Sequence, residues 1–243
     1  MASGKTVIAF DLYGTLLSTD SIAKELATHL GHDKAQEVAS LWRRYQLEYT
    51  WRLNSMGIYR SFSECTRGAL QHAVTELGLT LSSTDESDLM RAYNSLHTFP
   101  EVAGALERAA ENDMVDVYIF SNGTDDMIRA SVTTSPDLKP HAGLFKDMIS
   151  VEEVQVFKPT RNSYTHLQKR VGKEEGADDL WLVSANPFDV IGAKAAGLRV
   201  AWIDRAGKGW ADRLGDVIGG LKPDIIANGV DKAVLEIMDA SRK

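Results

Sequence analysis

The stretch V-I-A-F-D-L-Y-G-T-L-L, residues 7–17, decides the fold. An apolar, β-rich run over Thr6–Phe10 ends at Asp11, and Gly14 and Thr15 follow within four residues. An aspartate just past a strand often only caps a helix or forms a turn. Gly14, however, can adopt a positive φ and let the backbone approach a ligand. The stretch alone therefore leaves two readings of Asp11 open, a turn former or a catalytic carboxylate.

Three further β-rich runs follow along the chain, at Val115–Phe120, Leu180–Val183 and Arg199–Ile203. The first two of these end in polar clusters, S-N-G-T-D-D and S-A-N-P-F-D. Helix-like stretches separate the runs: Pro100–Asn112, Met127–Val132 and Ser163–Val171. Apolar strands that alternate with helices predict an α/β fold, a Rossmann-like parallel sheet with helices on both faces. Ligands bind such sheets at the carboxyl ends of the strands, so we expect the polar clusters to meet there.

The segment from Asp20 to Leu96 has helical periodicity and contains no convincing strand. Because it is inserted directly after the first strand, we expect a bundle of helices that caps the crevice. The predicted domains are an α/β core formed by residues 1–16 and 97–243 and a helical cap formed by residues 17–96. A last helix is expected at Asp231–Ala240.

Composition narrows the class of protein. The chain has 243 residues, 44% hydrophobic and 25% charged, with a formal net charge of -7, which argues against a nucleic-acid binder. One cysteine, Cys65, excludes an internal disulfide, and its neighbours offer no activating base. No apolar run approaches the ~20 residues of a membrane span, and no signal region precedes the first strand. We therefore expect a soluble, cytoplasmic protein. The six histidines lack metal-ligand spacing, so we expect no metal site.

Each polar cluster has a structural and a functional reading. Ser121 and Asn122 precede a helix expected near Asp125 and can form its turn, but exposed N–H groups at a helix start also bind small anions. Lys158 is either a surface lysine or a cation that offsets the charge of Asp11. Asp189 either caps the helix that contains G-A-K-A-A-G or faces Asp11 as a second carboxylate.

Together these motifs resemble the haloacid dehalogenase (HAD) superfamily, through D-L-Y-G-T-L, S-N-G-T, the lysine before a proline and the fourth motif that ends in Asp189. More closely, F-D-L-Y-G-T, L-W-R-R-Y-Q-L-E-Y-T-W, S-N-G, V-x-V-F-K-P and S-A-N-P-F-D look like the L-2-haloacid dehalogenases of type II. Superfamily phosphatases carry a second aspartate two residues after the first, and this chain has Tyr13 there. Phosphatases also bind Mg²⁺ with two acids in the last motif, the first of which is here Ala185. Both differences point away from phosphoryl transfer.

The resemblance implies hydrolytic dehalogenation of short-chain 2-haloalkanoic acids to 2-hydroxyalkanoic acids, through an ester on Asp11 and with inversion at C2. It implies no cofactor; the partners are the 2-haloalkanoate, a halide ion and water, and a homodimer is expected. Arg43 on the cap matches the family's halide-binding arginine, with Asn122 assisting. Ser121 and the backbone N–H groups after Asp11, beginning with Leu12, would hold the substrate carboxylate.

By the same resemblance, Asp189 positions or activates the hydrolytic water, supported by Thr15, Lys158, Tyr164, Ser184 and Asn186. An apolar pocket for the alkyl group would be lined by Tyr13, Leu47, Phe62 and Phe188. Phe188 stands where the family has tryptophan and Arg44 where it has glutamine, and we expect both at the pocket wall. Two alternatives stay open, a HAD-type phosphatase with an altered acid/base and a catalytically inactive HAD-like binding protein.

Overall fold

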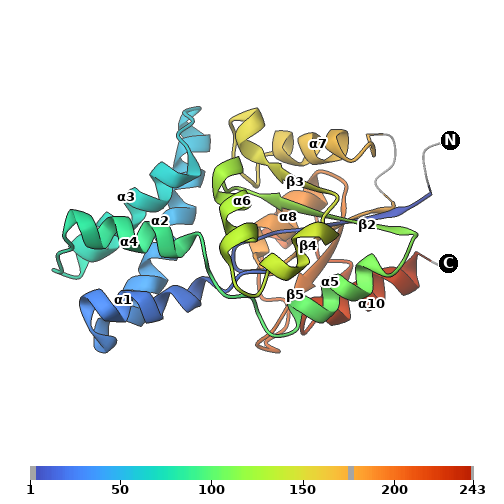
Figure 1. The fold of residues 1–243 in the computed structure, drawn as a ribbon. Coiled ribbons are helices and arrows are strands. Elements are labelled where there is room, and N and C mark those ends of the chain that lie inside the picture. The colour runs from blue at the N-terminus through green and yellow to red at the C-terminus, as the bar shows by residue number, and fades with distance from the viewer. Residues whose placement is uncertain (1–3, 175–177, 242–243) are drawn as a thin grey trace.

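A six-stranded parallel sheet organises the chain (Figure 1). The computed structural model describes residues 4–174 and 178–241, so the outermost residues of the predicted core, 1–3 and 242–243, lie outside the described part. The strand order is β3-β2-β1-β4-β5-β6. The strands are β1 (Thr6–Phe10), β2 (Val115–Ser121), β3 (Asp147–Ser150), β4 (Leu180–Ser184), β5 (Arg199–Ile203) and β6 (Ile225–Ala227). The predicted parallel α/β sheet is confirmed.

The central position of β1 explains why its end carries the site. All five of its residues are buried, and Phe10 lies beside Ile119 of β2 and Val183 of β4. This register brings the residues that follow the three strands to one edge of the sheet. Strands β3 and β6 were not predicted, because their sequences D-M-I-S and I-I-A are too short to show a pattern.

Helices cover the sheet. In Figure 1, α7 lies above the sheet, while α5 and α10 pack against each other below it. The side chain of Thr124 accepts from the N–H of Met127 at 3.2 Å and caps the helix that was expected near Asp125. These helices are α5 (Val102–Ala110), α6 (Asp125–Thr134), α7 (Arg161–Arg170), α8 (Pro187–Ala195), α9 (Leu214–Val217) and α10 (Val230–Ala240). Short 3₁₀ turns lie at η1 (Thr19–Ile22), η2 (Lys139–Leu144) and η3 (Val151–Val154).

Residues 19–93, which we call the helical insert, form a separate group of helices beside the sheet (Figure 1). They are α1 (Ala23–Leu30), α2 (His32–Met56), α3 (Phe62–Glu76) and α4 (Ser83–Tyr93), after η1. Reciprocal capping bonds fix two helix starts, between Ser61 and Glu64 and between Ser82 and Asp85. The described residues of this insert contain helices and no strand, as predicted.

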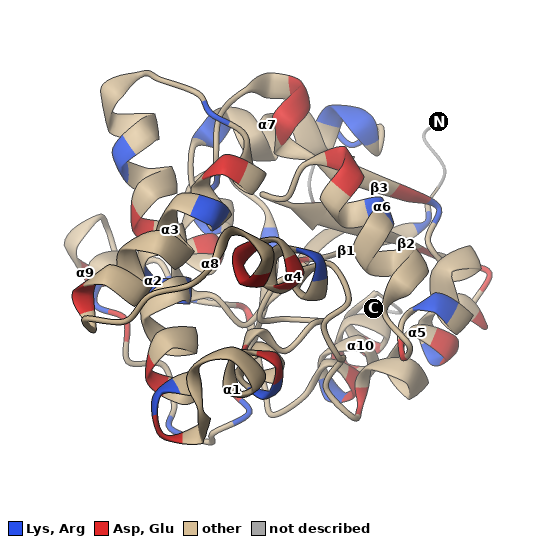
Figure 2. Cartoon of the chain, turned by 60° about the vertical axis from the view of Figure 1, so that its left-hand side comes forward, with Lys and Arg blue, Asp and Glu red and all other residues tan. Residues whose placement is uncertain are grey.

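Figure 2 shows Lys and Arg interspersed with Asp and Glu along the helices of both parts. Among the helices of the described residues, none combines the length and the apolar character needed to cross a membrane.

Candidate active site

Asp11 lies directly beyond the end of β1 and is only 7% exposed. Its Oδ2 atom accepts hydrogen bonds from Thr15 Oγ1 and Asn186 Nδ2, both at 2.7 Å, and from Ser184 Oγ at 3.4 Å. Its Oδ1 atom accepts from Lys158 Nζ at 3.2 Å. The carboxylate is therefore oriented by several donors rather than used as a helix cap, and its two oxygens have different surroundings.

Lys158 is a buried cation and not a surface lysine, since it is 1% exposed. Besides Asp11, its ammonium donates to Asp189 Oδ2 at 2.9 Å and to the carbonyl oxygen of Phe120 at 2.7 Å. A buried charge is costly unless it is paired and hydrogen-bonded, and here two carboxylates and a carbonyl meet that need. Of the two readings of Lys158, the structure thus supports the one in which it offsets the charge of Asp11.

Asp189 is fully buried in the first turn of α8, where Asn186 occupies the cap position instead. The Tyr164 hydroxyl donates to its Oδ1 atom at 2.8 Å, and Lys158 donates to its Oδ2 atom. Burial raises the pKa of Asp189, against the opposing effect of the Lys158 ammonium. Burial also raises the pKa of Tyr164 well above its usual value, so this hydroxyl stays protonated as a donor. Asp189 is the second carboxylate of the cluster.

Arg43 reaches this cluster from α2. Its Nη2 atom donates to the carbonyl oxygen of Tyr13 at 3.0 Å and to Asn186 Oδ1 at 3.3 Å. Because Asn186 also donates to Asp11, one amide separates the guanidinium from the carboxylate. Gly14 adopts φ 86°, the left-handed conformation expected from the sequence, and a Cβ there would lie 3.7 Å from Arg43 Nη2. The Arg43 guanidinium therefore packs directly against the turn that follows β1.

Sequence reasoning missed a residue that orients Arg43. The side chain of Gln46 is fully buried, and its Oε1 atom accepts from Arg43 Nη1 at 2.7 Å and from the Tyr93 hydroxyl at 3.0 Å. Its Nε2 atom donates to Thr66 Oγ1 at 2.7 Å. The spacing of three residues between Arg43 and Gln46 on a helix was the available signal, since such pairs share one face.

Tyr13 is buried between the core and the helical insert. Its ring lies 5.8 Å from that of Phe62 and 5.5 Å from that of Tyr93, and its hydroxyl shares a hydrogen bond with Ser131 Oγ at 3.3 Å. Burial raises the pKa of Tyr13 further above its usual value, so it cannot exchange protons near neutral pH. At the other position where a phosphatase has an acid, Ala185 contributes a backbone N–H that donates to Thr15 Oγ1 at 2.9 Å.

The S-N-G-T motif lies at the same edge of the sheet. Asn122 Oδ1 accepts from the N–H of Lys158 at 2.9 Å, which fixes the orientation of its side-chain amide. Ser121 is fully buried, and its Oγ atom accepts from the N–H of Gly123 at 3.0 Å. Leu12 is buried too, and its carbonyl oxygen accepts from the N–H groups of the following turn.

Three predicted residues, Phe188, Leu47 and Arg44, are described by neighbours other than Asp11. Phe188 packs edge-on against Trp51, with ring centroids 5.4 Å apart, beside a cavity of about 500 Å³ that both rings help to line. Leu47 is half-buried one helical turn after Arg43 and therefore faces the same side of α2. The expectation for Arg44 was wrong. Its side chain is 58% exposed and pairs with Glu76 and the Tyr45 hydroxyl, because adjacent helix positions point about 100° apart.

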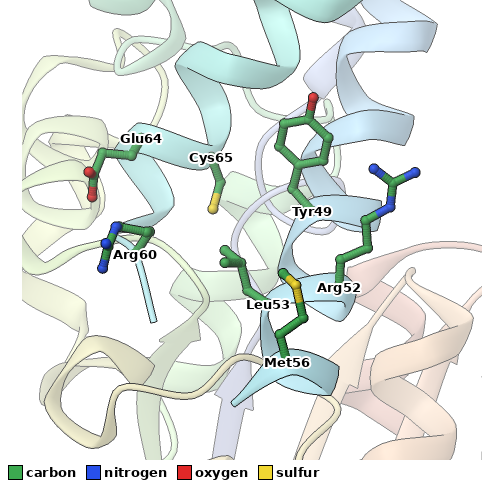
Figure 3. A pocket seen from close by; sticks show the side chains of 7 residues that line it. All are labelled: Tyr49, Arg52, Leu53, Met56, Arg60, Glu64 and Cys65. Carbon is green, nitrogen blue, oxygen red and sulfur yellow. The ribbon is translucent and has the colours of Figure 1, made fainter. Parts of the chain in front are cut away.

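Another cavity, of about 320 Å³, lies within the helical insert (Figure 3). It is lined by Tyr49, Arg52, Leu53, Met56, Arg60, Glu64 and Cys65, none of which belongs to the predicted site. Burial raises the pKa of the Cys65 thiol to about 11, which disfavours the reactive thiolate. The buried charges around Asp11, and not the presence of a cavity, therefore identify the candidate active site. Within residues 4–174 and 178–241, no group of three or more His, Cys, Asp or Glu side chains is placed to hold a metal ion.

Comparison with known proteins identifies the family. A family model described as haloacid dehalogenase-like hydrolase matches residues 5–197, so the chain belongs to that family of hydrolases. An (S)-2-haloacid dehalogenase of Pseudomonas fluorescens is 38% identical over 197 residues, which cover 81% of this chain and 83% of that protein. Within the family, the chain is an enzyme of the (S)-2-haloacid dehalogenases.

Solved structures lead to the same family. The structure of L-2-haloacid dehalogenase from Xanthobacter autotrophicus has a TM-score of 0.83 and 28% identity, and the match covers 96% of this chain and 98% of that one. A second structure of that enzyme, with chloropropionic acid covalently bound, has a TM-score of 0.81, 28% identity and the same coverage. The resemblance inferred from the motifs is confirmed.

Proposed function

We propose that this enzyme hydrolyses short-chain 2-haloalkanoic acids to 2-hydroxyalkanoic acids, with Asp11 as the nucleophile. One observation carries the proposal: the two oxygens of the Asp11 carboxylate are held differently. Oδ2 accepts from Thr15, Ser184 and Asn186, whereas Oδ1 accepts from Lys158. Oδ1 accepts fewer hydrogen bonds than Oδ2, so it is the better placed of the two to attack carbon. The three donors to Oδ2 can stabilise the negative charge that develops on this oxygen in the later hydrolysis step.

In the first step, Oδ1 attacks C2 of the substrate from the face opposite the halogen. The new C–O bond forms as the carbon–halogen bond breaks, the halide leaves with the bonding electron pair, and C2 is inverted. Arg43 supplies the positive charge for the departing halide, and Asn122 Nδ2 supplies a hydrogen bond. Ser121 and the N–H groups of Leu12 and Tyr13 hold the substrate carboxylate. The alkyl group is enclosed by Tyr13, Leu47, Phe62 and Phe188.

In the second step, water attacks the carbonyl carbon of the Asp11 ester. The oxyanion forms on Oδ2, where Thr15 Oγ1 and Asn186 Nδ2 already lie at 2.7 Å and act as an oxyanion hole. Asp189 takes the proton of the water, a task that its raised pKa favours. Tyr164 and Lys158 hold Asp189 in place. The tetrahedral intermediate collapses as the bond from its carbon to Oδ1 breaks, and the departing alkoxide takes the proton back from Asp189. The 2-hydroxy acid leaves with Oδ1, the oxygen of water remains on Asp11, and the new Asp11 carboxyl group releases its proton to solvent.

The similarity to the Xanthobacter autotrophicus enzyme with covalently bound chloropropionic acid supports a covalent route in this chain. We also propose that residues 17–96 act as a cap domain that closes the site, because Arg43 and Phe62 come from this segment. A homodimer is proposed as well, with two exposed apolar residues in the contact: Met56, the last residue of α2, and Ile58, just beyond it. Sedimentation equilibrium of the wild type and of Met56→Glu tests the dimer.

Single turnover in H₂¹⁸O, followed by mass spectrometry of the peptide that contains Asp11, tests the mechanism. We expect the label in the Asp11 carboxylate after one turnover of 2-chloropropionate, and halide release from one enantiomer with EDTA present. Label in the product with none on Asp11 would exclude the ester. If neither enantiomer releases halide and Asp11-dependent hydrolysis of p-nitrophenyl phosphate requires Mg²⁺, the protein is a phosphatase. A folded protein without either activity is a binding protein.

A further inference from the structure

The peptide group that joins Phe157 to Lys158 is held from two sides. Asn54, near the end of α2, donates from Nδ2 to the carbonyl oxygen of Phe157 at 2.8 Å and accepts at Oδ1 from the N–H of Phe157 at 2.9 Å. At the other end of the same peptide group, the N–H of Lys158 donates to Asn122 Oδ1 at 2.9 Å. The side-chain amide of Asn54 therefore forms hydrogen bonds with both the N–H and the carbonyl oxygen of Phe157, the residue before Lys158.

The side chain of Phe157 is enclosed by the same helical insert. Phe157 is fully buried, and its ring centroid lies 5.3 Å from that of Tyr59 and 6.1 Å from that of Phe62. The insert thus contacts this one core residue through its main chain and its ring. Phe157 and Asn54 form the junction between the insert and the loop that carries Lys158.

Asn54 and Arg43 belong to one continuous helix. Eleven residues separate them, which corresponds to about three turns, about 16 Å, and leaves the two side chains within about 20° of the same face. Trp51, between them, packs against Phe188 of the core. A displacement of α2 that withdraws Arg43 from Tyr13 and Asn186 therefore also pulls Asn54 away from Phe157.

We propose that Asn54 is a positioning residue that couples the seating of the helical insert to the placement of Lys158. Arg43, which stabilises the departing halide in the first step, and Lys158, which holds Asp189 for the second step, then reach their positions together. The inference rests on the proposed function, since it takes both cations as parts of that reaction. A carboxamide suits the role because it donates and accepts at once, as the carbonyl and N–H of Phe157 require.

Asn54→Asp gives a test that depends on pH. When ionised, this carboxylate accepts from the N–H of Phe157 but repels its carbonyl oxygen, whereas the protonated acid restores both bonds. We expect kcat for chloride release to fall about tenfold or more at pH 8 relative to wild type. The ratio of variant to wild-type kcat should then recover as the pH falls toward 5, because a carboxyl group facing a carbonyl has a pKa above its usual value of ~3.9.

Two further variants complete the test. Asn54→Ala should lose a similar factor in kcat, with little change in KM, and show no recovery at low pH. Ser55→Ala changes an exposed residue of the same turn and should match wild type throughout. A ratio for Asn54→Asp that stays constant with pH, or a kcat for Asn54→Ala within twofold of wild type, would overturn the inference.

Amide hydrogen exchange separates this inference from the proposed function. In the folded protein, Asn54→Ala should raise the exchange rates of the Phe157 and Lys158 N–H groups at least tenfold, while Ser55→Ala leaves them unchanged. Absence of halide release by the wild type would refute the proposed function and with it the coupling to catalysis. The exchange rates would still report whether Asn54 holds the main chain of Phe157. Wild-type activity together with unchanged exchange and unchanged kcat in Asn54→Ala would refute the positioning role alone.

Discussion

The guanidinium of Arg43 donates to the buried side-chain oxygen of Gln46 at 2.7 Å, three residues further along α2. Gln46 also accepts from Tyr93 and donates to Thr66, so its amide is fixed at both ends. An amide directs the guanidinium without cancelling its charge. The full positive charge of Arg43 therefore remains for the halide that we propose it receives.

Gln46→Glu should weaken halide release. A carboxylate at this position forms an ion pair with Arg43 and reduces the positive field at the leaving group. We expect kcat for 2-chloropropionate to fall about tenfold or more and the inhibition constant for added chloride to rise. The matched control is Gln36→Glu, the same change at an exposed position of the same helix. A chloride inhibition constant equal to that of wild type would show that Arg43 does not hold the halide.

Tyr13→Phe should leave catalysis almost unchanged. The hydroxyl that it removes lies 3.3 Å from Ser131 Oγ, and burial keeps it protonated. We expect kcat within twofold of wild type and superimposable pH profiles between pH 6 and 10. Tyr13→Asp should instead destabilise the fold by about 3–5 kcal/mol, because it buries a carboxylate without a partner. Loss of a basic limb in the pH profile of Tyr13→Phe would assign this tyrosine a chemical role.

The sequence predicted those site residues whose positions follow from the sheet. Asp11 directly follows one strand, and Ser121 and Ser184 are the last residues of two others. Parallel strands of matched register carry their ends to one edge of the sheet, however distant they are in sequence. For the same reason, the proximity of Asp11 to the S-A-N-P-F-D motif could be predicted without knowing how the helices pack.

Residues that act across two elements could not be found in this way. The contact of Asn54 with Phe157 depends on where the end of α2 rests on the core, and periodicity gives only the face of a helix, not its partner. Arg44 was misplaced for a related reason: its resemblance to a pocket position in other proteins does not fix the direction of a long, flexible side chain that finds Glu76 nearby.

Asp189→Asn should abolish most activity and change how stability depends on pH. The pKa of Asp189 is raised above 3.8 in the folded protein, so its ionisation disfavours folding. That cost is absent below pH 3.8 and grows as the pH rises through the raised pKa. We therefore expect the free energy of unfolding of the variant, relative to wild type, to increase from pH 3.5 to pH 7. At the same time, kcat should fall about 100-fold or more.

Urea unfolding across this pH range measures the difference between Asp189→Asn and wild type. Asp113→Asn, an exposed aspartate, is the control and should show no such slope. A relative stability of Asp189→Asn that decreases with rising pH would mean that pairing with Lys158 outweighs burial and that the pKa of Asp189 is lowered.

Gly192 allows α8 to approach the residues that hold Asp189. A Cβ atom at this position would lie 2.4 Å from the Tyr164 hydroxyl and 2.5 Å from Pro159 Cβ, closer than any Cβ can come. Gly192→Ala should therefore displace Tyr164, weaken its bond to Asp189 and destabilise the protein by about 1–3 kcal/mol. We expect kcat to fall with it, since Asp189 loses one of its two donors and keeps Lys158.

Gly104→Ala is the matched control. Gly104 is an exposed residue of α5 with no atom within 4 Å of an added Cβ, so the substitution should stabilise the helix by about 0.5–1 kcal/mol and leave kcat unchanged. Urea unfolding and chloride release on both variants separate crowding from helix propensity, because the two glycines lie in helices and differ in what surrounds them. If Gly192→Ala is as stable and as active as Gly104→Ala, Tyr164 does not need its present position to support Asp189.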